Sequence, residues 1–147
     1  MNRARLLASE SKGKSMTVLR TMMRWLLGLL FVTAGVLHFL FAAYYVRIMP
    51  PYLPWHLALV YVSGVAEASL GVLLLVPRFQ AVAAWGLIAL LIAVFPANVH
   101  MALHPDLFPQ YEPAMLWGRL PLQGVLIAWA YWFTGGIVGR RLSEPEA

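Results

Sequence analysis

Four long apolar stretches constrain the fold of this chain more than any other feature of its sequence. They cover about 23–46, 55–76, 80–103 and 115–134. A transmembrane helix needs roughly 20 apolar residues, and in lipid only helices and closed barrels satisfy the backbone polar groups. The stretches are continuous and lack the alternation typical of barrel strands. The sequence therefore predicts an all-α protein, a polytopic membrane four-helix bundle.

The composition supports this class. Of the 147 residues, 61% are hydrophobic and only 12% are charged, whereas soluble domains carry charge on roughly 25% of residues. The net charge of +5 does not indicate nucleic-acid binding, because the basic residues flank the apolar stretches, where they fix topology and meet lipid headgroups. The chain has no cysteine, which excludes a thiol-disulfide mechanism or a thiolate metal site carried by this polypeptide.

The distribution of lysine and arginine predicts the topology. With both termini in the cytoplasm, nine of the eleven basic residues lie inside, and only Arg47 and Arg119 lie outside. The positive-inside rule therefore places the N and C termini in the cytoplasm of a multi-pass protein of the inner (cytoplasmic) membrane. Aromatic residues collect at the proposed outer interface, as in an aromatic belt. They are Tyr44, Tyr45, Tyr52, Trp55, Tyr111 and Trp117.

The same patterns divide the chain into three parts. Residues 1–20 are polar and basic, and we expect a disordered cytoplasmic tail there. Residues 21–136 form the transmembrane domain, and 137–147 form a cytoplasmic C-terminal tail. Met16 is an alternative start to Met1, because the membrane pattern begins just after it. The two outer loops, 49–55 and 104–113, are apolar and rich in proline, so they form either plain turns or a stiff lid or docking surface.

One acid stands out within the spans. Glu67 is the only charged residue between Arg47 and Arg78. A carboxylate at bilayer depth costs a few kcal/mol on insertion scales, so it is normally paired, protonated or turned into the bundle. Ser63, Gly64 and Gly71 share one helix face with it. Small residues there let a neighbouring helix approach closely, with the carboxyl pointing into the seam.

Each span carries one strongly polar group in its outward half: His38, Glu67, Asn98 and Gln123. We therefore expect a polar cluster facing an outward-opening cavity. Arg119 lies four residues before Gln123, on the same helix face, and is the preferred electrostatic partner of the acid, through Gln123. The candidate ligand-binding residues are Glu67, His38, Asn98, Gln123, Arg119 and Ser63.

Each candidate also has a structural interpretation. The acid and the imidazole can serve as hydrogen-bonded packing residues, the two amides as links between helices, and the arginine as an ordinary snorkelling residue. His100 and His104 lie four apart, but no third ligand is secured and Pro105 ends the helix. We therefore predict no metal site, and we assign no catalytic residue.

Several segments between about residue 20 and 134 form a recognisable set. They are Ala34-Gly35-Val36-Leu37-His38-Phe39, Pro50-Pro51-Tyr52-Leu53-Pro54, Ser63-Gly64-Val65-Ala66-Glu67, Leu75-Val76-Pro77-Arg78, Ala84-Trp85-Gly86-Leu87, Phe95-Pro96-Ala97-Asn98 and Arg119-Leu120-Pro121-Leu122-Gln123. This set resembles the DoxX-like family of small four-helix integral membrane proteins. The resemblance implies a four-helix bundle with cytoplasmic ends.

The resemblance also implies a functional context, because members have been tied to quinone-linked thiosulfate oxidation, oxidative-stress complexes and assembly of other membrane proteins. We expect an accessory subunit of a membrane redox or oxidative-stress system, not an enzyme as an isolated chain, with a quinone-like or lipidic ligand. The alternatives are an assembly factor for a partner membrane protein and a small proton-coupled transporter, for which a homo-oligomer would supply further spans.

Overall fold

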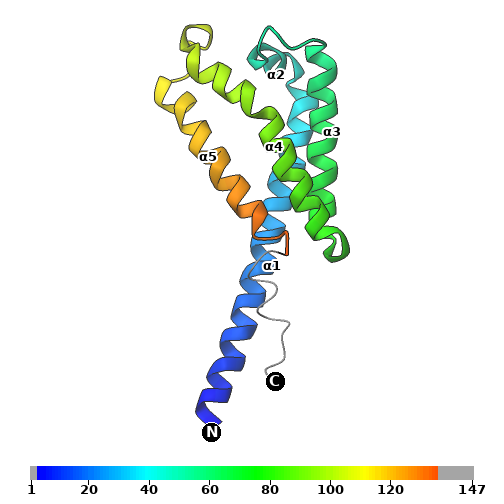
Figure 1. The fold of residues 1–147 in the computed structure, drawn as a ribbon, viewed down its shortest axis with the longest axis vertical. Coiled ribbons are helices and arrows are strands. Elements are labelled where there is room, and N and C mark those ends of the chain that lie inside the picture. The colour runs from blue at the N-terminus through cyan, green and yellow to red at the C-terminus, as the bar shows by residue number, and fades with distance from the viewer. Residues whose placement is uncertain (1–2, 136–147) are drawn as a thin grey trace.

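The computed structural model describes residues 3–135, with side chains from residue 13 onward, and consists entirely of helices and loops over that range. The long helices alternate in direction along the chain (Figure 1). Their bounds are α1 (Arg3–Leu40), α2 (Ala42–Ile48), α3 (His56–Leu75), η1 (Pro77–Phe79), α4 (Gln80–Leu103), η2 (Pro105–Leu107) and α5 (Pro113–Tyr131). We call the end of the bundle where α3 and α5 finish the lower end, and the opposite end the upper end.

Three segments are long and apolar enough to cross a membrane: Gly13–Leu40, His56–Leu75 and Pro77–Leu103. The all-helical class is therefore confirmed for the described residues, and the chain has the composition of an integral membrane protein. Helix α5 is not in this group. Arg119 and Gln123 lie on it, and such strongly polar residues lower the mean hydropathy of a span.

The apolar stretches predict the helix boundaries well after residue 50. The predicted spans 55–76 and 80–103 correspond to α3 and α4, and the span 115–134 corresponds to α5, which begins at Pro113. Proline at the first helical position is expected, because its missing N–H would have no partner in the helix there. These three helices are therefore positioned by the pattern of the sequence alone.

The N-terminal segment differs from its prediction. Helix α1 continues without interruption from Arg3 to Leu40 and extends beyond the lower end of the bundle (Figure 1), whereas a disordered tail is predicted for 1–20. Residues 3–20 contain no proline and are rich in Ala, Leu, Lys and Arg, which are strong helix formers. A helix already nucleated in the span propagates at little cost through such residues. The predicted tail 137–147 lies outside the described residues.

The first span is not one continuous helix. The predicted span 23–46 is broken at Phe41, which has φ −122° and ψ 36°. The backbone N–H groups of Tyr44 and Tyr45 both donate to the Phe41 carbonyl, at 2.9 and 3.2 Å, so a new helix, α2, starts there. The break lets the chain change direction at the upper end and brings α2 against α3 and α4.

Helices α1 and α3 approach closely along a seam of glycines. Gly28 and Gly35 face Gly71 and Gly64 across this seam. A Cβ built on Gly35 would lie 2.6 Å from both the Ala68 nitrogen and the Gly64 oxygen, and one on Gly71 would lie 2.8 Å from the Gly28 oxygen. No side chain fits at such distances from backbone atoms. The predicted close approach at Gly64 and Gly71 is therefore found, and its partner is α1.

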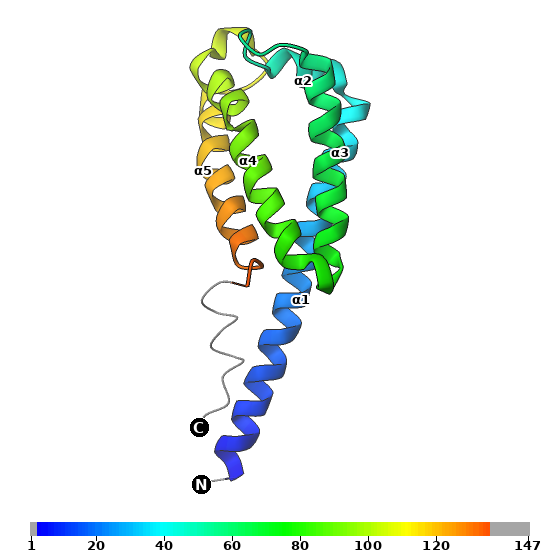
Figure 2. The ribbon, with the colours of Figure 1, turned by 45° about the vertical axis from the view of Figure 1, so that its right-hand side comes forward.

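The bundle consists of two helix pairs with two apolar clusters. Helix α1 packs mainly on α3, and α5 packs mainly on α4, with α3 and α4 joining the pairs (Figure 2). The lower cluster consists of Leu27, Phe31, Leu74, Ala83, Ala84, Leu87, Ile88, Leu91, Ala130 and Phe133. The upper cluster consists of Ile48, Met101, Phe108 and Leu116, with Tyr44, Tyr45 and Tyr111 against it.

The first upper loop, 49–55, is partly tied down. Pro50 is fully buried, and its carbonyl lies 3.1 Å from Nε2 of His56. In contrast, Tyr52 and Trp55 are 72% and 80% exposed. Trp55 has φ 53°, a left-handed conformation that is uncommon for a residue with a Cβ. The loop therefore holds two large aromatic side chains away from the bundle.

Candidate functional site

The buried acid lies beside the histidine of the neighbouring helix. Oε2 of Glu67, on α3, is 3.3 Å from Nδ1 of His38, on α1, and the two side chains are only 15% and 12% exposed. The glycine seam permits this contact, because a Cβ on Gly64 would lie 2.7 Å from the Cβ of His38. Two residues singled out in the sequence therefore form one pair across α1 and α3.

The hydrogen bonds of the imidazole suggest how the pair carries its proton. Nδ1 of His38 also lies 2.9 Å from the carbonyl oxygen of Ala34. A proton on Nδ1 serves both acceptors, the carbonyl and the carboxylate of Glu67. The other ring nitrogen, Nε2, then has no hydrogen-bond partner among residues 13–135. It can accept a hydrogen bond when the ring is neutral and donate one when the ring is protonated.

Two tyrosines of α2 extend the site from this pair. The ring of Tyr45 stacks on His38, with centroids 3.8 Å apart and an interplanar angle of 21°. Tyr44 meets Tyr45 edge to face, with centroids 5.5 Å apart. The hydroxyl of Tyr44 in turn accepts a hydrogen bond from Nη2 of Arg119 at 3.2 Å. A continuous path of contacts thus runs from Glu67 to Arg119 through α1 and α2.

Arg119 does not bond to Glu67 or to Gln123 among the described residues, so the predicted partnership with the acid through Gln123 is not found. Its guanidinium donates to Tyr44 and to the sulfur of Met101, the latter at 3.4 Å, and lies over the ring of Tyr111 at 5.4 Å. Among residues 13–135, the only ion pair of Glu67 is with His38. The reason is the packing of α5, which lies mainly on α4, so the long stem of the arginine reaches the aromatic residues of the upper end.

The phenol of Tyr111, beside Arg119, stays neutral at ordinary pH. The side-chain hydrogen bond with Tyr44 raises the pKa of Tyr111 above its ordinary value. Arg119 therefore has aromatic and thioether neighbours but no carboxylate among the described residues. It provides a positive charge that is only weakly compensated at the upper end.

The two amides form a separate link between α4 and α5. Nδ2 of Asn98 donates to Oε1 of Gln123 at 2.9 Å, and Nε2 of Gln123 donates to the carbonyl of Leu91. Gln123 is only 3% exposed. Both ends of its amide are therefore satisfied within this helix pair, as in the structural interpretation, and they do not connect Arg119 to Glu67.

The remaining candidates do not join the acid either. The hydroxyl of Ser63 donates to the Val60 carbonyl of its own helix at 2.9 Å. The rings of His100 and His104 have centroids 4.4 Å apart, and the described part of the chain holds no group of three His, Asp or Glu residues that could bind a metal.

The predicted single cluster is thus divided into an acid–histidine–tyrosine–arginine path and an amide pair. The sequence predicts Tyr44 and Tyr45 only as part of an aromatic belt and not as part of this path. One signal was available: Tyr45 follows His38 by seven residues, or two helical turns. The break at Phe41 could not be read from this spacing.

Comparisons with known proteins give one family assignment. No curated protein and no solved structure matches the chain, so the resemblance to DoxX-like proteins stays a prediction. A family model described as "Domain of unknown function (DUF8561)" matches residues 27–134. The match includes every residue of the acid–histidine–tyrosine–arginine path and the amide pair. The chain therefore belongs to the DUF8561 family.

Proposed function

We propose that this protein is a four-span protein of the cytoplasmic membrane that binds a quinone-like lipophilic ligand at the His38–Glu67 pair, as an accessory subunit of a redox or oxidative-stress system. In this proposal α5 is the fourth span, and both termini are cytoplasmic. The antiparallel packing of α5 on α4 (Figure 2) and the bias of basic residues support this topology.

The observation that carries the proposal is the contact between Glu67 and His38 at 3.3 Å, in stretches of α1 and α3 that have no other charged side chain. Ionisable residues within membrane helices are costly and typically mark ligand or proton pathways. This pair is also connected to the upper end through Tyr45 and Tyr44, which gives it a polar route out of the bundle.

The chemistry of the pair suits a quinone head group. A quinone carbonyl accepts hydrogen bonds, and a hydroquinone hydroxyl donates them. An imidazole and a carboxyl group in contact can exchange a proton, so His38 and Glu67 can offer a donor to the first form and an acceptor to the second. The surrounding apolar walls suit the rest of such a ligand. The electrons come from a partner subunit in this proposal.

We expect Glu67→Gln to reduce the amount of quinone that co-purifies with the protein about tenfold, because the carboxylate no longer accepts a charge-assisted hydrogen bond from His38, the ring that donates to the quinone carbonyl. The measurement is solvent extraction of the purified protein followed by chromatography and mass spectrometry. Glu112→Gln is the matched control, since it makes the same chemical change on an exposed residue of the upper loop. Equally empty wild-type and Glu67→Gln preparations would count against the proposal.

A second candidate is a helper that stabilises a partner membrane protein. The exposed Tyr52 and Trp55 favour it, because the loop holds both side chains away from the bundle. We expect a photo-crosslinker at position 55 to capture one stoichiometric membrane protein, and a crosslinker at Val82, which is 70% exposed on α4, to capture lipid only. Equal products at both positions would argue against a partner at this loop. A partner found together with no bound small molecule would favour this candidate over the first.

A further inference from the structure

A second polar site lies at the lower end, away from the acid. Nη2 of Arg20 donates to the Trp132 carbonyl at 3.4 Å. Nη1 of Arg24 donates to Oε1 of Gln80 at 3.1 Å, and Nε2 of Gln80 donates to the Phe133 carbonyl at 3.1 Å. Side chains of α1 and α4 thus reach the last carbonyls beyond α5. Such carbonyls lack partners within their own helix and attract positive charge.

Two buried hydrogen-bond donors near this end of the bundle have no acceptor among residues 13–135. In the part of the chain with described side chains, the only buried side-chain nitrogen or oxygen atoms without a partner are Nε of Arg24 and Nε1 of Trp129. Trp129 lies in the last turn of α5, and it packs against the lower cluster, as does Met23, the neighbour of Arg24. A native structure rarely leaves a buried donor unpaired, so both atoms point to a missing acceptor.

The geometry of Arg24 specifies what kind of acceptor is missing. Oε1 of Gln80 accepts from Nη1 of Arg24. The Nε and Nη2 groups of Arg24 form the other edge of the guanidinium, and their N–H bonds point in parallel. No residue from 13 to 135 accepts from that edge, and neither Arg20 nor Arg24 forms an ion pair with a carboxylate there. A parallel pair of charged donors matches two oxygens of one phosphate or carboxylate group.

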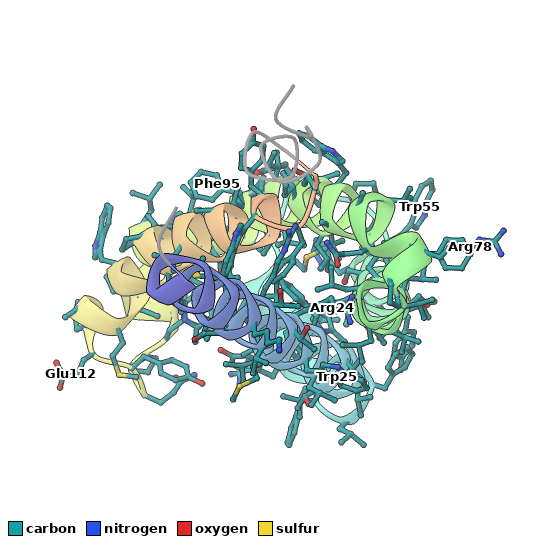
Figure 3. All side chains as sticks on the ribbon, turned by 90° about the horizontal axis from the view of Figure 1, so that it is seen from below. Arg24, Trp25, Trp55, Arg78, Phe95 and Glu112 are labelled. Carbon is teal, nitrogen blue, oxygen red and sulfur yellow. The ribbon has the colours of Figure 1, made fainter. Side chains whose placement is uncertain are left out.

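The position favours phosphate over carboxylate. Arg20 and Arg24 lie on α1 within the segment Gly13–Leu40, at the end of the bundle that also carries Arg78. Basic residues at the end of membrane helices lie at the level of the lipid headgroups, and basic sites between membrane helices bind phospholipid headgroups. In the view from below, Arg24 lies between the helices, whereas Arg78 points away from them at the periphery (Figure 3).

We propose that the corner formed by Arg20, Arg24 and Trp129 binds a phosphate group, carried by a phospholipid whose headgroup enters between α1 and the end of α5. One phosphate oxygen accepts from Nε of Arg24, a second accepts from Nη2, and the indole of Trp129 donates to the same headgroup. The site is independent of the acid–histidine pair.

The experiment uses the full-length protein in detergent and native mass spectrometry with added phosphatidylglycerol. Arg24→Lys keeps the charge and removes the parallel donor edge, so we expect the dissociation constant to rise about tenfold. Arg78→Lys is the matched control at the same end of the bundle and should leave the constant unchanged. Trp129→Phe keeps an aromatic ring and removes the indole N–H donor, so it should also weaken binding. This variant provides the test if Arg24→Lys does not fold.

Two further arms identify the ligand. Diacylglycerol with the same acyl chains should not bind at this site, because it lacks the phosphate. Competition by millimolar inorganic phosphate would support the phosphate site but assign it to the free ion. Binding by Arg24→Lys and Trp129→Phe that equals wild type would overturn the proposal. Equal binding of diacylglycerol and phosphatidylglycerol would do so as well.

Discussion

Gly35→Ala is expected to separate α1 from α3 and to lower the free energy of unfolding by about 1–3 kcal/mol, the usual cost of overpacking. The new Cβ would lie 2.6 Å from the Ala68 nitrogen and the Gly64 oxygen. Both are backbone atoms of a long helix, so they cannot move aside singly. This cost exceeds the roughly 1 kcal/mol that alanine gains over glycine in helix propensity. The measurement is denaturation in mixed detergent micelles, followed by circular dichroism.

The chain contains matched controls for this prediction. A Cβ on Gly118 or Gly124 would meet no atom within 4 Å. Alanine there should leave stability unchanged or raise it by up to about 1 kcal/mol, from helix propensity alone. If Gly35→Ala is as stable as Gly118→Ala, the close seam between α1 and α3 does not exist in the membrane. The seam also holds His38 beside Glu67, so Gly35→Ala should impair ligand retention together with stability.

Gln123→Leu is expected to lower the free energy of unfolding by about 1–2 kcal/mol, even though leucine is more apolar and has a similar size. The substitution removes the hydrogen bonds that Gln123 makes with Asn98 and with the Leu91 carbonyl. A buried polar group left unpaired costs about 1–3 kcal/mol, while measured hydrogen bonds between membrane helices average about 0.6 kcal/mol. The same denaturation assay measures the difference.

A double-mutant cycle separates this hydrogen bond from general packing. Because Asn98 and Gln123 contact each other, replacing both by leucine should cost less than the two single changes added together. Ser63→Ala is the control and should have little effect, since its hydroxyl bonds only within α3. Strict additivity of the two leucine substitutions would show that the amides do not interact.

Much of the fold could be predicted from the sequence, because bilayer thickness and backbone hydrogen bonding leave few options for long apolar stretches. The spans 55–76 and 80–103 correspond closely to α3 and α4. The break at Phe41 was not predictable, since no proline or glycine marks it. The helix over residues 3–20 was not predicted, because the low hydrophobicity of this segment indicates disorder. The segment is helical in the structure since the helix of the first span continues into it.

The candidate site was predicted in part. Polarity within apolar spans singled out His38 and Glu67, and the spacing of Gly64 and Gly71 indicated a close helix contact. The partner of Arg119 could not be predicted, because it depends on which helix α5 packs against. Sequence periodicity gives the face that a residue occupies, but the pairing of faces is a property of the whole bundle.

The short helix α2 has a consequence for communication across the upper end. A single non-helical residue separates it from α1, and a proline-rich loop separates it from α3. Its adjacent residues Tyr44 and Tyr45 touch Arg119 and His38 respectively. A rotation of α2 that alters one contact must alter the other. A displacement of α2 would therefore reach the imidazole and the guanidinium at the same time.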